Sequence, residues 1–386
     1  MWPAIWLATC TQEMYFRKDI VMNSGVPLSL VMARGVKDRY VKGMMRWHYE
    51  HGLVIQACLA VGQHYHLEEE FSPWAYSLYD PLIGQDGTIA TYRKGEYNLD
   101  QINAGRNLFA LHDRTGEERF LLAAHRLKDQ LVHHPRTLSG VFWHKEIYPW
   151  QIWLDGVYMQ GPFNAQYATR FGGDEDIDDL IRQVERVYAL LSDPDTGLLY
   201  HAYDESKGMR WSDQQTGLSP HFWGRAVGWF CMALVDIYEL LPHKEVLIKI
   251  LTSVLDAVLS FQDSTGLWYQ VMDKGGEKGN YLESSASSMF AAVLFKAVRL
   301  GIVTDAKEQE LYLNQARKAL EGLNTTFLRR DERGTLHLGG ICSVAGLGGN
   351  PYRPGTFSYY ISEPVVEDDF KGVGPYILAL LESERT

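Results

Sequence analysis

The chain has 386 residues, 46% hydrophobic and 22% charged, which suits a soluble globular protein of one large domain or two ordinary ones. Its formal net charge of −11 argues against nucleic acid or an anionic membrane as the main partner. No segment approaches about eighteen uninterrupted apolar residues, so we do not expect a membrane span.

The N-terminal stretch and four scattered cysteines bear on the compartment. Residues 1–19 contain a short apolar run with no basic residue before it, so we do not interpret them as a secretory signal. Cys10, Cys58, Cys231 and Cys342 form no CxxC pair. We interpret them as reduced thiols of a cytoplasmic protein rather than a disulfide framework or a zinc site.

Helical periodicity dominates the chain, and clear strand pairs are few. Helices are predicted over 52–66, 99–113, 117–133, 150–169, 175–192, 222–241, 244–262, 284–300, 305–327 and 372–384. Between them recurs a loop in which a glycine precedes short extended residues, as in GQDGTIATY and PDTGLLYHAYD. The glycines of these loops are Gly87, Gly140, Gly197, Gly266 and Gly334.

The spacing of these glycines indicates a repeat. They lie 53 to 69 residues apart, and each interval holds two helices and one long loop. With a sixth loop near VVEDDFKGVGP, we predict an all-α (α/α)6 barrel, formed by residues 1–386 as a single catalytic domain with a pocket at one end. An open α-solenoid is the alternative. Polar and aromatic residues together on the candidate inner helices favour the ring, because they suit a cavity better than a dry stack.

Asp100, in GEYNLDQINAGR, is the first candidate catalytic residue. Asn98 is predicted to cap a helix that begins here, with Gln101 three residues later as in a capping box. Asp100 would then lie in the first helical turn and stay ionised. The structural alternative is ordinary, because the helix dipole favours acidic residues there by about 0.3–1 kcal/mol.

Asp155 is the second candidate, in the apolar segment YPWQIWLDGVYMQGPF. With a helical period, Ile152, Asp155, Met159 and Pro162 share one face, so the carboxyl group should point into the core. A carboxyl buried there is paired, protonated or functional, or else it caps a neighbouring loop. An ionised Asp100 and a protonated Asp155 would form the pair that acid/base catalysis on a sugar requires.

A third segment, GLLYHAYDESKGMRWSDQQTGLSPHFWGRAVGWF, gathers His201, His221, Trp223, Arg225 and Trp229. Arg225 begins an otherwise apolar helix and should have an anionic partner, either an internal salt bridge or the carboxylate of a substrate. Trp223 and Trp229 are candidates for stacking on sugar rings, with core packing as the alternative.

His144 and Lys145, in FWHKEIYP, add positive charge near another loop end, although either could equally be a solvated loop residue. The chain has no HExxH motif, EF-hand loop, P-loop, strand-linked GxGxxG or GxSxG elbow. We therefore expect no metal and no cofactor. The glycine-rich segment GGICSVAGLGG is interpreted as a loop at the pocket rim.

Together these segments resemble the unsaturated rhamnogalacturonyl hydrolases of glycoside hydrolase family 105. The resemblance rests on NLDQINAGR, WLDGVYMQGPF, GLLYHAYDE, GLSPHFWGRAVGWF, ESSASSMFAAVL and GGICSVAGLG, in this order between about residues 45 and 380. It implies an (α/α)6 barrel and an unusual reaction. Such enzymes hydrate the C4=C5 bond of a terminal 4,5-unsaturated galacturonyl residue left by pectin lyases, and the opening hemiketal releases the neighbouring sugar, typically rhamnose.

The resemblance also implies roles for single residues. Asp155 would be the general acid/base and Asp100 the assisting carboxylate, while contacts to the unsaturated sugar are expected from His201, Arg225, Trp223, Trp229, His144 and Lys145. Two alternatives stay open: an unsaturated glucuronyl hydrolase for glycosaminoglycan lyase products, and a non-catalytic sugar-binding toroid. The joint presence of Asp100, Asp155 and Arg225 argues against the toroid. The partner would be a small oligosaccharide, and the protein a monomer or homodimer.

Overall fold

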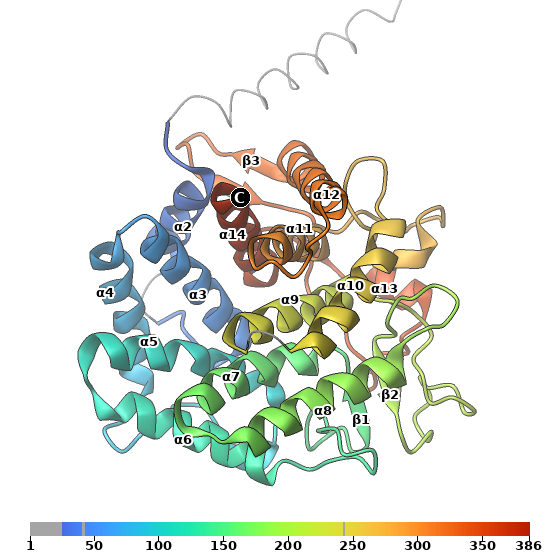
Figure 1. Ribbon diagram of the computed structural model, residues 1–386, viewed down its shortest axis with the longest axis horizontal. Helices are drawn as coiled ribbons and strands as arrows, with labels where there is room; N and C mark the ends of the chain where they lie inside the picture. Colours follow the sequence, from blue (N-terminus) through green and yellow to red (C-terminus); the bar gives the residue numbers. More distant parts are fainter. Residues whose placement is uncertain (1–24, 41–42, 242–243) are drawn as a thin grey trace, which may run out of the picture.

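The computed structural model describes residues 25–40, 43–241 and 244–386, and helices dominate it (Figure 1). The N-terminal stretch and Cys10 lie outside these residues. Six helices form an inner ring: α3 (Tyr49–His64), α5 (Arg106–Thr115), α7 (Gly156–Phe171), α9 (Gly224–Leu240), α11 (Ser284–Arg299) and α14 (Phe370–Arg385). Six others lie outside them: α2 (Leu28–Arg39), α4 (Glu68–Tyr79), α6 (Glu118–His133), α8 (Asp174–Leu191), α10 (Glu245–Ser260) and α12 (Ala306–Thr326).

The ring is closed, which excludes the open solenoid. The inner helices pack in chain order, and α14 contacts α3 as well as α11, so the last helical hairpin meets the first. Every residue of α9 from Gly224 to Tyr238 is buried, as expected for a helix covered on all sides. The outer helix α8 instead buries one stripe, including Leu180, Val184 and Val187. The predicted (α/α)6 barrel is confirmed.

Two details of the predicted repeat were wrong. The sixth hairpin consists of α2 and α3 at the beginning of the described chain, whereas the segment near VVEDDFKGVGP belongs to the connection that leads into α14. Helices α2, α4 and the short α13 (Phe357–Ser362) were not predicted. The remaining connections contain single 3-10 turns at Asp80–Leu82, Lys94–Glu96, Leu99–Gln101, Asn103–Gly105 and Met272–Lys274.

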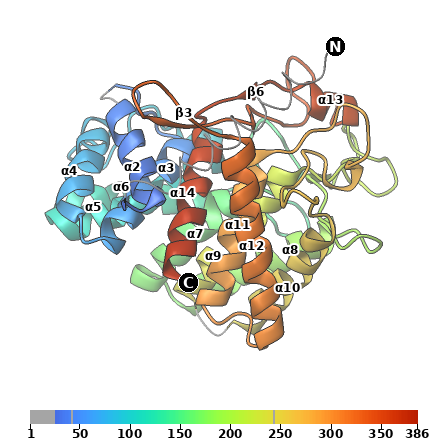
Figure 2. The same cartoon turned by 90° about the horizontal axis from the view of Figure 1, so that it is seen from above.

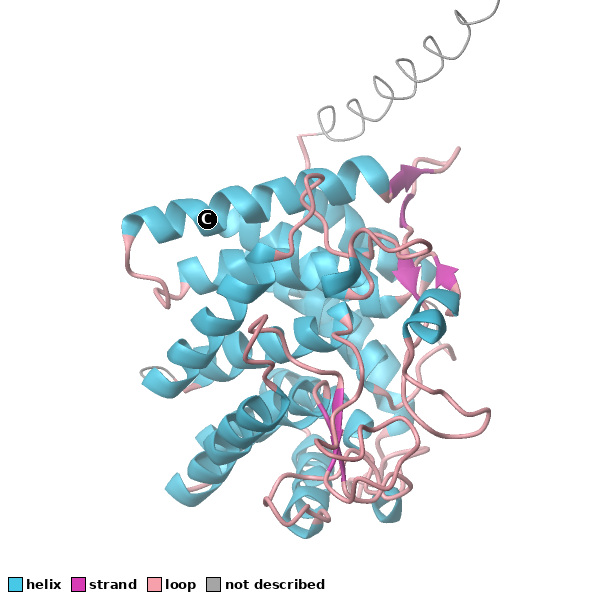
Figure 3. Cartoon of the chain, turned by 90° about the vertical axis from the view of Figure 1, so that its right-hand side faces the viewer, coloured by secondary structure: helices cyan, strands magenta, loops and turns pink. Residues whose placement is uncertain are grey.

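The strands form three short antiparallel pairs among the loops (Figure 3). They are β1 (Gln151–Trp153) with β2 (Ala202–Asp204), β3 (Leu328–Arg330) with β4 (Leu336–Leu338), and β5 (Ile341–Cys342) with β6 (Val365–Val366). In the first pair, Ile152 lies opposite Tyr203. The predicted helix over 150–169 is therefore wrong at its start, because β1 precedes α7 and Asp155 stands between them.

The five repeated glycines lie in equivalent turns. All have a positive φ between 72° and 87°. Each turn follows an outer helix and leads towards the next inner helix. In one of them the Gly266 amide donates to the Asp263 carbonyl at 2.8 Å, and the Asp263 amide donates to the Leu267 carbonyl at 2.8 Å. This alternation brings the beginnings of the inner helices to one end of the barrel; Figure 2 shows β3 and β6 at one end and the C-terminus at the other.

Within the described ranges, no helix combines the length and the hydropathy that a membrane crossing needs.

Candidate active site

Charged side chains from the first turns of the inner helices, and from the residues just before them, meet at one end of the barrel. Glu50 of α3 pairs with Lys371 of α14 at 2.9 Å, and Arg225 of α9 lies 3.9 Å from Glu283, which caps α11. Asp155 directly precedes α7. Helix N-termini carry partial positive charge, so this end of the barrel favours an anionic ligand.

Asp100 is held as a carboxylate. Its Oδ2 lies 2.5 Å from Lys145 Nζ, and its Oδ1 lies 3.3 Å from His144 Nε2. Burial alone would raise the pKa of Asp100, but Lys145 and then His144 outweigh burial and hold the pKa well below its usual range. The side-chain cap from Asn98 is confirmed, since its Oδ1 accepts the Asp100 amide at 3.0 Å.

The local structure around Asp100 differs from the prediction in one respect. A continuous helix over 99–113 does not form; two 3-10 turns precede α5. The capping box is also incomplete, because the Gln101 Oε1 atom is buried without a hydrogen-bond partner among the described residues. Asp100 therefore owes its position to the Asn98 cap and to Lys145.

The surroundings of Asp155 shift its pKa in the opposite direction. It is 9% exposed, and its Oδ1 atom has no hydrogen-bond partner in the described part of the chain. Burial raises the pKa of Asp155; His144 partly opposes this effect, and the Asp100 carboxylate adds to it. The raised pKa was predicted, but its cause is the packing around the start of α7 rather than a helix face shared with Ile152. Asp155 is thus the more readily protonated member of the pair.

Two histidines flank the Asp155 carboxyl. His144 Nε2 lies 3.9 Å from Oδ2 and His201 Nε2 lies 3.9 Å from Oδ1. The His201 Nδ1 atom is 2.7 Å from the Tyr360 hydroxyl. Burial raises the pKa of Tyr360 well above its usual range, so the hydroxyl keeps its proton in this hydrogen bond.

Burial also determines the charge of His201. Burial, followed by the charge of His144, lowers the pKa of His201 well below its usual range, so the ring is neutral. A neutral imidazole carries one N–H group, and the Nε2 atom of this ring faces Asp155. The site therefore places an uncharged imidazole beside the carboxyl that is more easily protonated.

An aromatic stack supports His144. Its ring lies parallel to Trp153, with centroids 4.7 Å apart and an interplanar angle of 5°. Tyr148 also stacks on Trp153, with centroids 5.0 Å apart. The sequence reasoning missed Trp153 and Tyr360, although Trp153 stands two residues before Asp155 in the motif WLDG, which was a usable signal. No comparable local signal marks Tyr360, which is 159 residues from His201.

Arg225 has internal partners, as expected from the interpretation in which it forms an internal salt bridge. Its Nη1 donates to the Cys342 carbonyl and to Ser285 Oγ at 3.3 Å, and its Nη2 donates to the Ser343 carbonyl at 3.4 Å. The guanidinium lies 3.9 Å from Glu283. Its Nε atom has no hydrogen-bond partner within the described ranges. Most donors of Arg225 are therefore occupied.

The two candidate stacking residues lie at different depths. The Trp223 ring is 4.8 Å from the His201 ring and 4.8 Å from the Arg225 guanidinium, so it belongs to the cluster. Trp229 is 1% exposed and stacks on Tyr158 in the core. It reaches the cluster through Tyr49, whose ring meets its edge with centroids 5.8 Å apart. Tyr49 was also missed by the sequence reasoning.

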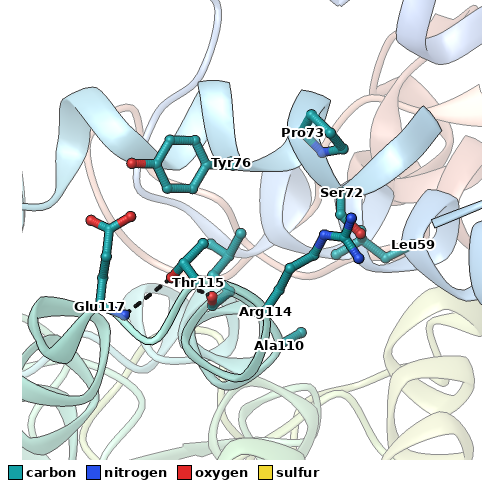
Figure 4. Close-up of a pocket in the computed structure, with 9 residues that line it drawn as sticks. Leu59, Ser72, Pro73, Tyr76, Ala110, Arg114, Thr115 and Glu117 are labelled. Atoms are coloured by element: carbon teal, nitrogen blue, oxygen red, sulfur yellow. Dashed lines mark hydrogen bonds between the residues drawn. The ribbon is translucent and has the colours of Figure 1, made fainter. Parts of the chain in front are cut away.

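The more open cavities lie elsewhere. One, of about 300 Å³, lies between α4 and α5, where Tyr76, Arg114 and Glu117 are among its lining residues (Figure 4). Another, of about 880 Å³, is lined by Gln63, Asp113 and other residues towards the C-terminal ends of inner helices. Neither contains a candidate catalytic residue, whereas a small cavity beside the carboxyl pair is lined by His144, Trp153 and Gly156.

Two groups of side chains have the spacing of metal ligands. Donor atoms of Asp100, His144 and Asp155 lie within 4.8 Å of one another. Lys145 already supplies a positive charge to Asp100, which disfavours a metal ion at the same place. The second group, His337, Glu367 and Asp368, lies apart from the carboxyl pair, and its members also pair with one another and with nearby arginines.

A closed ring of six helical hairpins, with two buried carboxyl groups of opposite pKa shift at one end, places the protein in the class of (α/α)6-barrel proteins. Residues 31–386 match the model of Glycosyl Hydrolase Family 88, and the chain belongs to this family. It is therefore a glycoside hydrolase that acts on oligosaccharides. A solved family 105 glycoside hydrolase of C. acetobutylicum ATCC 824 is 44% identical, with a TM-score of 0.89 over 94% of this chain and 100% of that chain. The predicted resemblance to family 105 is confirmed.

Two further relatives are more distant. The unsaturated rhamnogalacturonyl hydrolase YesR of Bacillus subtilis (strain 168) is 29% identical over 213 residues, which are 53% of this chain and 59% of the relative. The solved unsaturated glucuronyl hydrolase of Bacillus sp. GL1, responsible for the degradation of glycosaminoglycan, is 15% identical. It has a TM-score of 0.68 over 92% of this chain and 95% of that chain, a likeness that shows the shared fold.

Proposed function

We propose that the enzyme hydrolyses unsaturated rhamnogalacturonan oligosaccharides left by pectin lyases. It hydrates the C4=C5 bond of the terminal 4,5-unsaturated galacturonyl residue and releases that residue from rhamnose. The observation that carries the proposal is the carboxyl pair, in which burial raises the pKa of Asp155 while Lys145 and His144 hold Asp100 ionised. The name of the Bacillus subtilis relative supports the choice of substrate.

The opposite pKa shifts of Asp155 and Asp100 suit the hydration of an enol ether. Protonated Asp155 gives its proton to C4, and positive charge develops at C5 and the ring oxygen. The Asp155 carboxylate formed in this step then takes a proton from water, whose oxygen bonds to C5. The product is a hemiketal, which opens and releases the neighbouring sugar. One residue thus serves both steps, and the anomeric bond is not attacked directly, so the usual carboxylate-spacing rule does not apply.

The side chains around Asp155 have roles that fit this reaction. The Asp100 carboxylate favours the positive charge that develops on the sugar and raises the pKa of Asp155. His201, whose Nε2 atom faces Asp155, contacts the reacting uronate, while Lys145 and His144 keep Asp100 ionised. Trp223 packs against the sugar, and Arg225 attracts its carboxylate through the donors that its internal partners leave open. Direct contact from Trp229 requires a shift of Tyr49, so we assign Trp229 an indirect part.

One assay tests the substrate. Loss of the near-ultraviolet absorbance of the unsaturated residue is followed with rhamnogalacturonan lyase products and glycosaminoglycan lyase products side by side. We expect turnover of the rhamnogalacturonan series with clear preference. Preference for the glycosaminoglycan series would assign the enzyme to unsaturated glucuronyl substrates, and binding without any turnover would indicate a sugar-binding toroid.

A second assay tests the bond that is made. In heavy-oxygen water, the label should enter at C5 of the released uronate, and the reducing carbon of the other product should carry none. Label at the anomeric carbon of the unsaturated residue would show ordinary glycoside hydrolysis and would contradict the proposed hydration.

We further propose that residues 1–386 act as a single catalytic domain, as a monomer or homodimer in the cytoplasm, in the degradation of pectin. The buried free thiols of Cys58, Cys231 and Cys342 support a reducing compartment. Sedimentation of the purified chain distinguishes monomer from homodimer.

A further inference from the structure

The glycine-rich segment at residues 343–356, called here the rim loop, is anchored beside the candidate site. Gly348 and Arg353 pair across it, with amide-to-carbonyl distances of 2.9 and 3.0 Å. Leu347 packs in a separate apolar cluster with Trp153, Ala202 and Trp211. The rim loop is thus held against the strand pair β1–β2, of which β1 directly precedes Leu154 and Asp155.

Arg353 of the rim loop reaches the aromatic stack of the site. Its Nη2 donates to the Tyr148 hydroxyl at 2.9 Å, and its guanidinium lies 5.9 Å from the centre of the Trp153 ring. Further bonds run from Nε to the Gly348 carbonyl at 3.0 Å and from Nη2 to the Leu347 carbonyl at 3.2 Å. The guanidinium group of Arg353 is therefore held in place by uncharged oxygen atoms, which belong to one hydroxyl and two carbonyl groups.

Arg353 differs in its partners from Lys145 and Arg225, two other cations of the site. Lys145 is paired with Asp100, and Arg225 lies 3.9 Å from Glu283. For Arg353, no carboxylate of the described chain lies within the 4.0 Å of an ion pair. In a protein of net charge −11, a partly exposed arginine without a carboxylate partner is an available site for an anionic group of a ligand.

The position of Arg353 relative to Asp155 indicates which part of a ligand it meets. Asp155 is buried, so the reacting non-reducing end must lie deepest. Trp153 lies between Asp155 and Arg353, because its ring stacks on His144 beside Asp155 and also has the Arg353 guanidinium over it. The sugars beyond the reacting residue must then extend outwards, past Trp153 and along the rim loop.

We propose that Arg353 is a specificity-determining residue that binds the carboxylate of the second uronate of the substrate, beyond the released bond. The inference rests on the proposed function. In a rhamnogalacturonan chain uronate and rhamnose alternate, so an unsaturated disaccharide carries one carboxylate and a tetrasaccharide carries a second. Arg353 therefore makes the enzyme prefer the longer substrate.

The test compares these two saccharides in wild type and Arg353→Gln. We expect wild type to prefer the tetrasaccharide in kcat/KM. The variant should lose about tenfold or more on the tetrasaccharide, the lower range for a hydrogen bond between charged groups, and stay within about twofold on the disaccharide. Added salt should reduce the wild-type preference and leave the variant unchanged, a response that a purely structural role of Arg353 would not produce.

Two control variants separate charge from loop structure. Tyr148→Phe removes one anchor and keeps the cation, so it should lose less on the tetrasaccharide than Arg353→Gln does. In Gly346→Ala the new methyl group would overlap Arg353 Nη1, so the guanidinium must move while its charge is kept. This variant should lose activity selectively on the tetrasaccharide. A tetrasaccharide with its internal uronate methyl-esterified should behave in wild type as the acid does in Arg353→Gln.

The outcomes distinguish this inference from the proposed function. Equal losses on both saccharides, or no loss on the tetrasaccharide, would overturn the role of Arg353 while leaving the reaction intact. If wild type turns over only the glycosaminoglycan series, the proposed substrate is wrong, and the same comparison is made with the disaccharide and tetrasaccharide of that series, which also differ by one uronate. If wild type turns over neither series, both proposals fail.

Discussion

The two central carboxyl groups differ because of what surrounds each of them. Asp155 is buried, and the two histidine rings beside it lie 3.9 Å away, so its charged form loses hydration without gaining an ion pair as close as that of Asp100. Asp100 is equally enclosed but has Lys145 at 2.5 Å. Lys145, followed by His144, therefore keeps Asp100 ionised, and the buried Asp100 carboxylate in turn favours protonation of its neighbour.

Replacing Asp155 by asparagine should abolish most of the activity. The amide keeps the size of the side chain but can neither protonate C4 nor accept a proton from water, so we expect kcat to fall by about 10²–10⁴-fold or more. Disaccharide binding should change little. Steady-state absorbance assays and equilibrium binding measure the two effects, and turnover within a few-fold of wild type would remove Asp155 from the mechanism.

The same replacement should stabilise the folded enzyme at neutral pH. Because the folded-state pKa of Asp155 is raised, its contribution to stability is complete below the unfolded pKa of about 3.9 and is lost as pH rises through the folded pKa. Asparagine carries no charge to bury. The urea midpoint of Asp155→Asn should exceed that of wild type at pH 7, and the gap should close near pH 3.5. A variant less stable than wild type at pH 7 would contradict this.

Replacing Asp100 by asparagine should move the pH profile of the remaining activity. The reaction needs protonated Asp155, so kcat/KM falls as pH rises through the Asp155 pKa. The Asp100 carboxylate raises that pKa, and its removal also frees the charge of Lys145, which lowers it. Both effects shift the alkaline limb to lower pH. Full pH–rate profiles of wild type and Asp100→Asn are the measurement, and an unmoved or upward-shifted limb would refute the coupling.

At the scale of secondary-structure elements, helical periodicity predicted the wrong structure for a short apolar run that pairs with a distant strand. Residues 151–153 suit a buried helix or a buried strand, and period alone does not distinguish these for so short a run. Their pairing with residues 202–204 decides in favour of a strand. The consequence for the site is direct, since β1 places Trp153 and Asp155 where a continuous helix could not.

The glycine turns between elements give a stability prediction at Gly266. Its φ is 87°, and a methyl group there would also lie 2.6 Å from the Lys318 carbonyl carbon in α12. Gly116, at the end of α5, has a φ of 71° and open space around it, which makes Gly116→Ala the matched control. We expect Gly116→Ala to lower the free energy of unfolding by about 1–2 kcal/mol and Gly266→Ala to lower it clearly more. Equal losses in urea titrations would show that the contact with α12 does not matter.

At the scale of the whole molecule, function depends on closure of the ring. The site takes His144, Asp155, His201 and Tyr360 from connections spread over more than half of the chain. Only the circular order of the inner helices brings these connections to one end. The seam between α14 and α3 completes that order, and it is closely packed, because a methyl group on Gly374 would lie 2.7 Å from Leu53 Cγ.

This seam can be tested with a double-mutant cycle. Gly374→Leu should overpack the seam and lower the free energy of unfolding by about 1–3 kcal/mol. Leu53→Ala should lower it by about 2–5 kcal/mol through a cavity, since Leu53 is fully buried. In the double variant the new side chain occupies the space left by Leu53, so the combined loss should fall short of the sum. Strict additivity in urea titrations would mean that the two residues do not share the seam.

Much of the fold could be predicted from local signals, whereas the pairing of charges in the site could not. The helical periods, the five glycine turns and the Asn98 cap are short-range features, and most are found at their predicted places, except at the starts of the helices predicted over 99–113 and 150–169. The predicted site residues Asp100, His144, Lys145, Asp155, His201, Trp223 and Arg225 are also brought together. Residues such as Tyr360 and Arg353 escaped notice because nothing in their immediate neighbourhood marks them.

The sequence by itself determined the repeat of helix pairs and the residue types capable of chemistry, because both depend on neighbours within a few positions along the chain. Only the tertiary structure decided which charges meet. Lys145 pairs with Asp100, Arg225 lies beside Glu283, and Arg353 is placed by neutral oxygens instead. These differences arise from contacts between residues far apart in the chain, which exist only once the ring has closed and removed the groups from water.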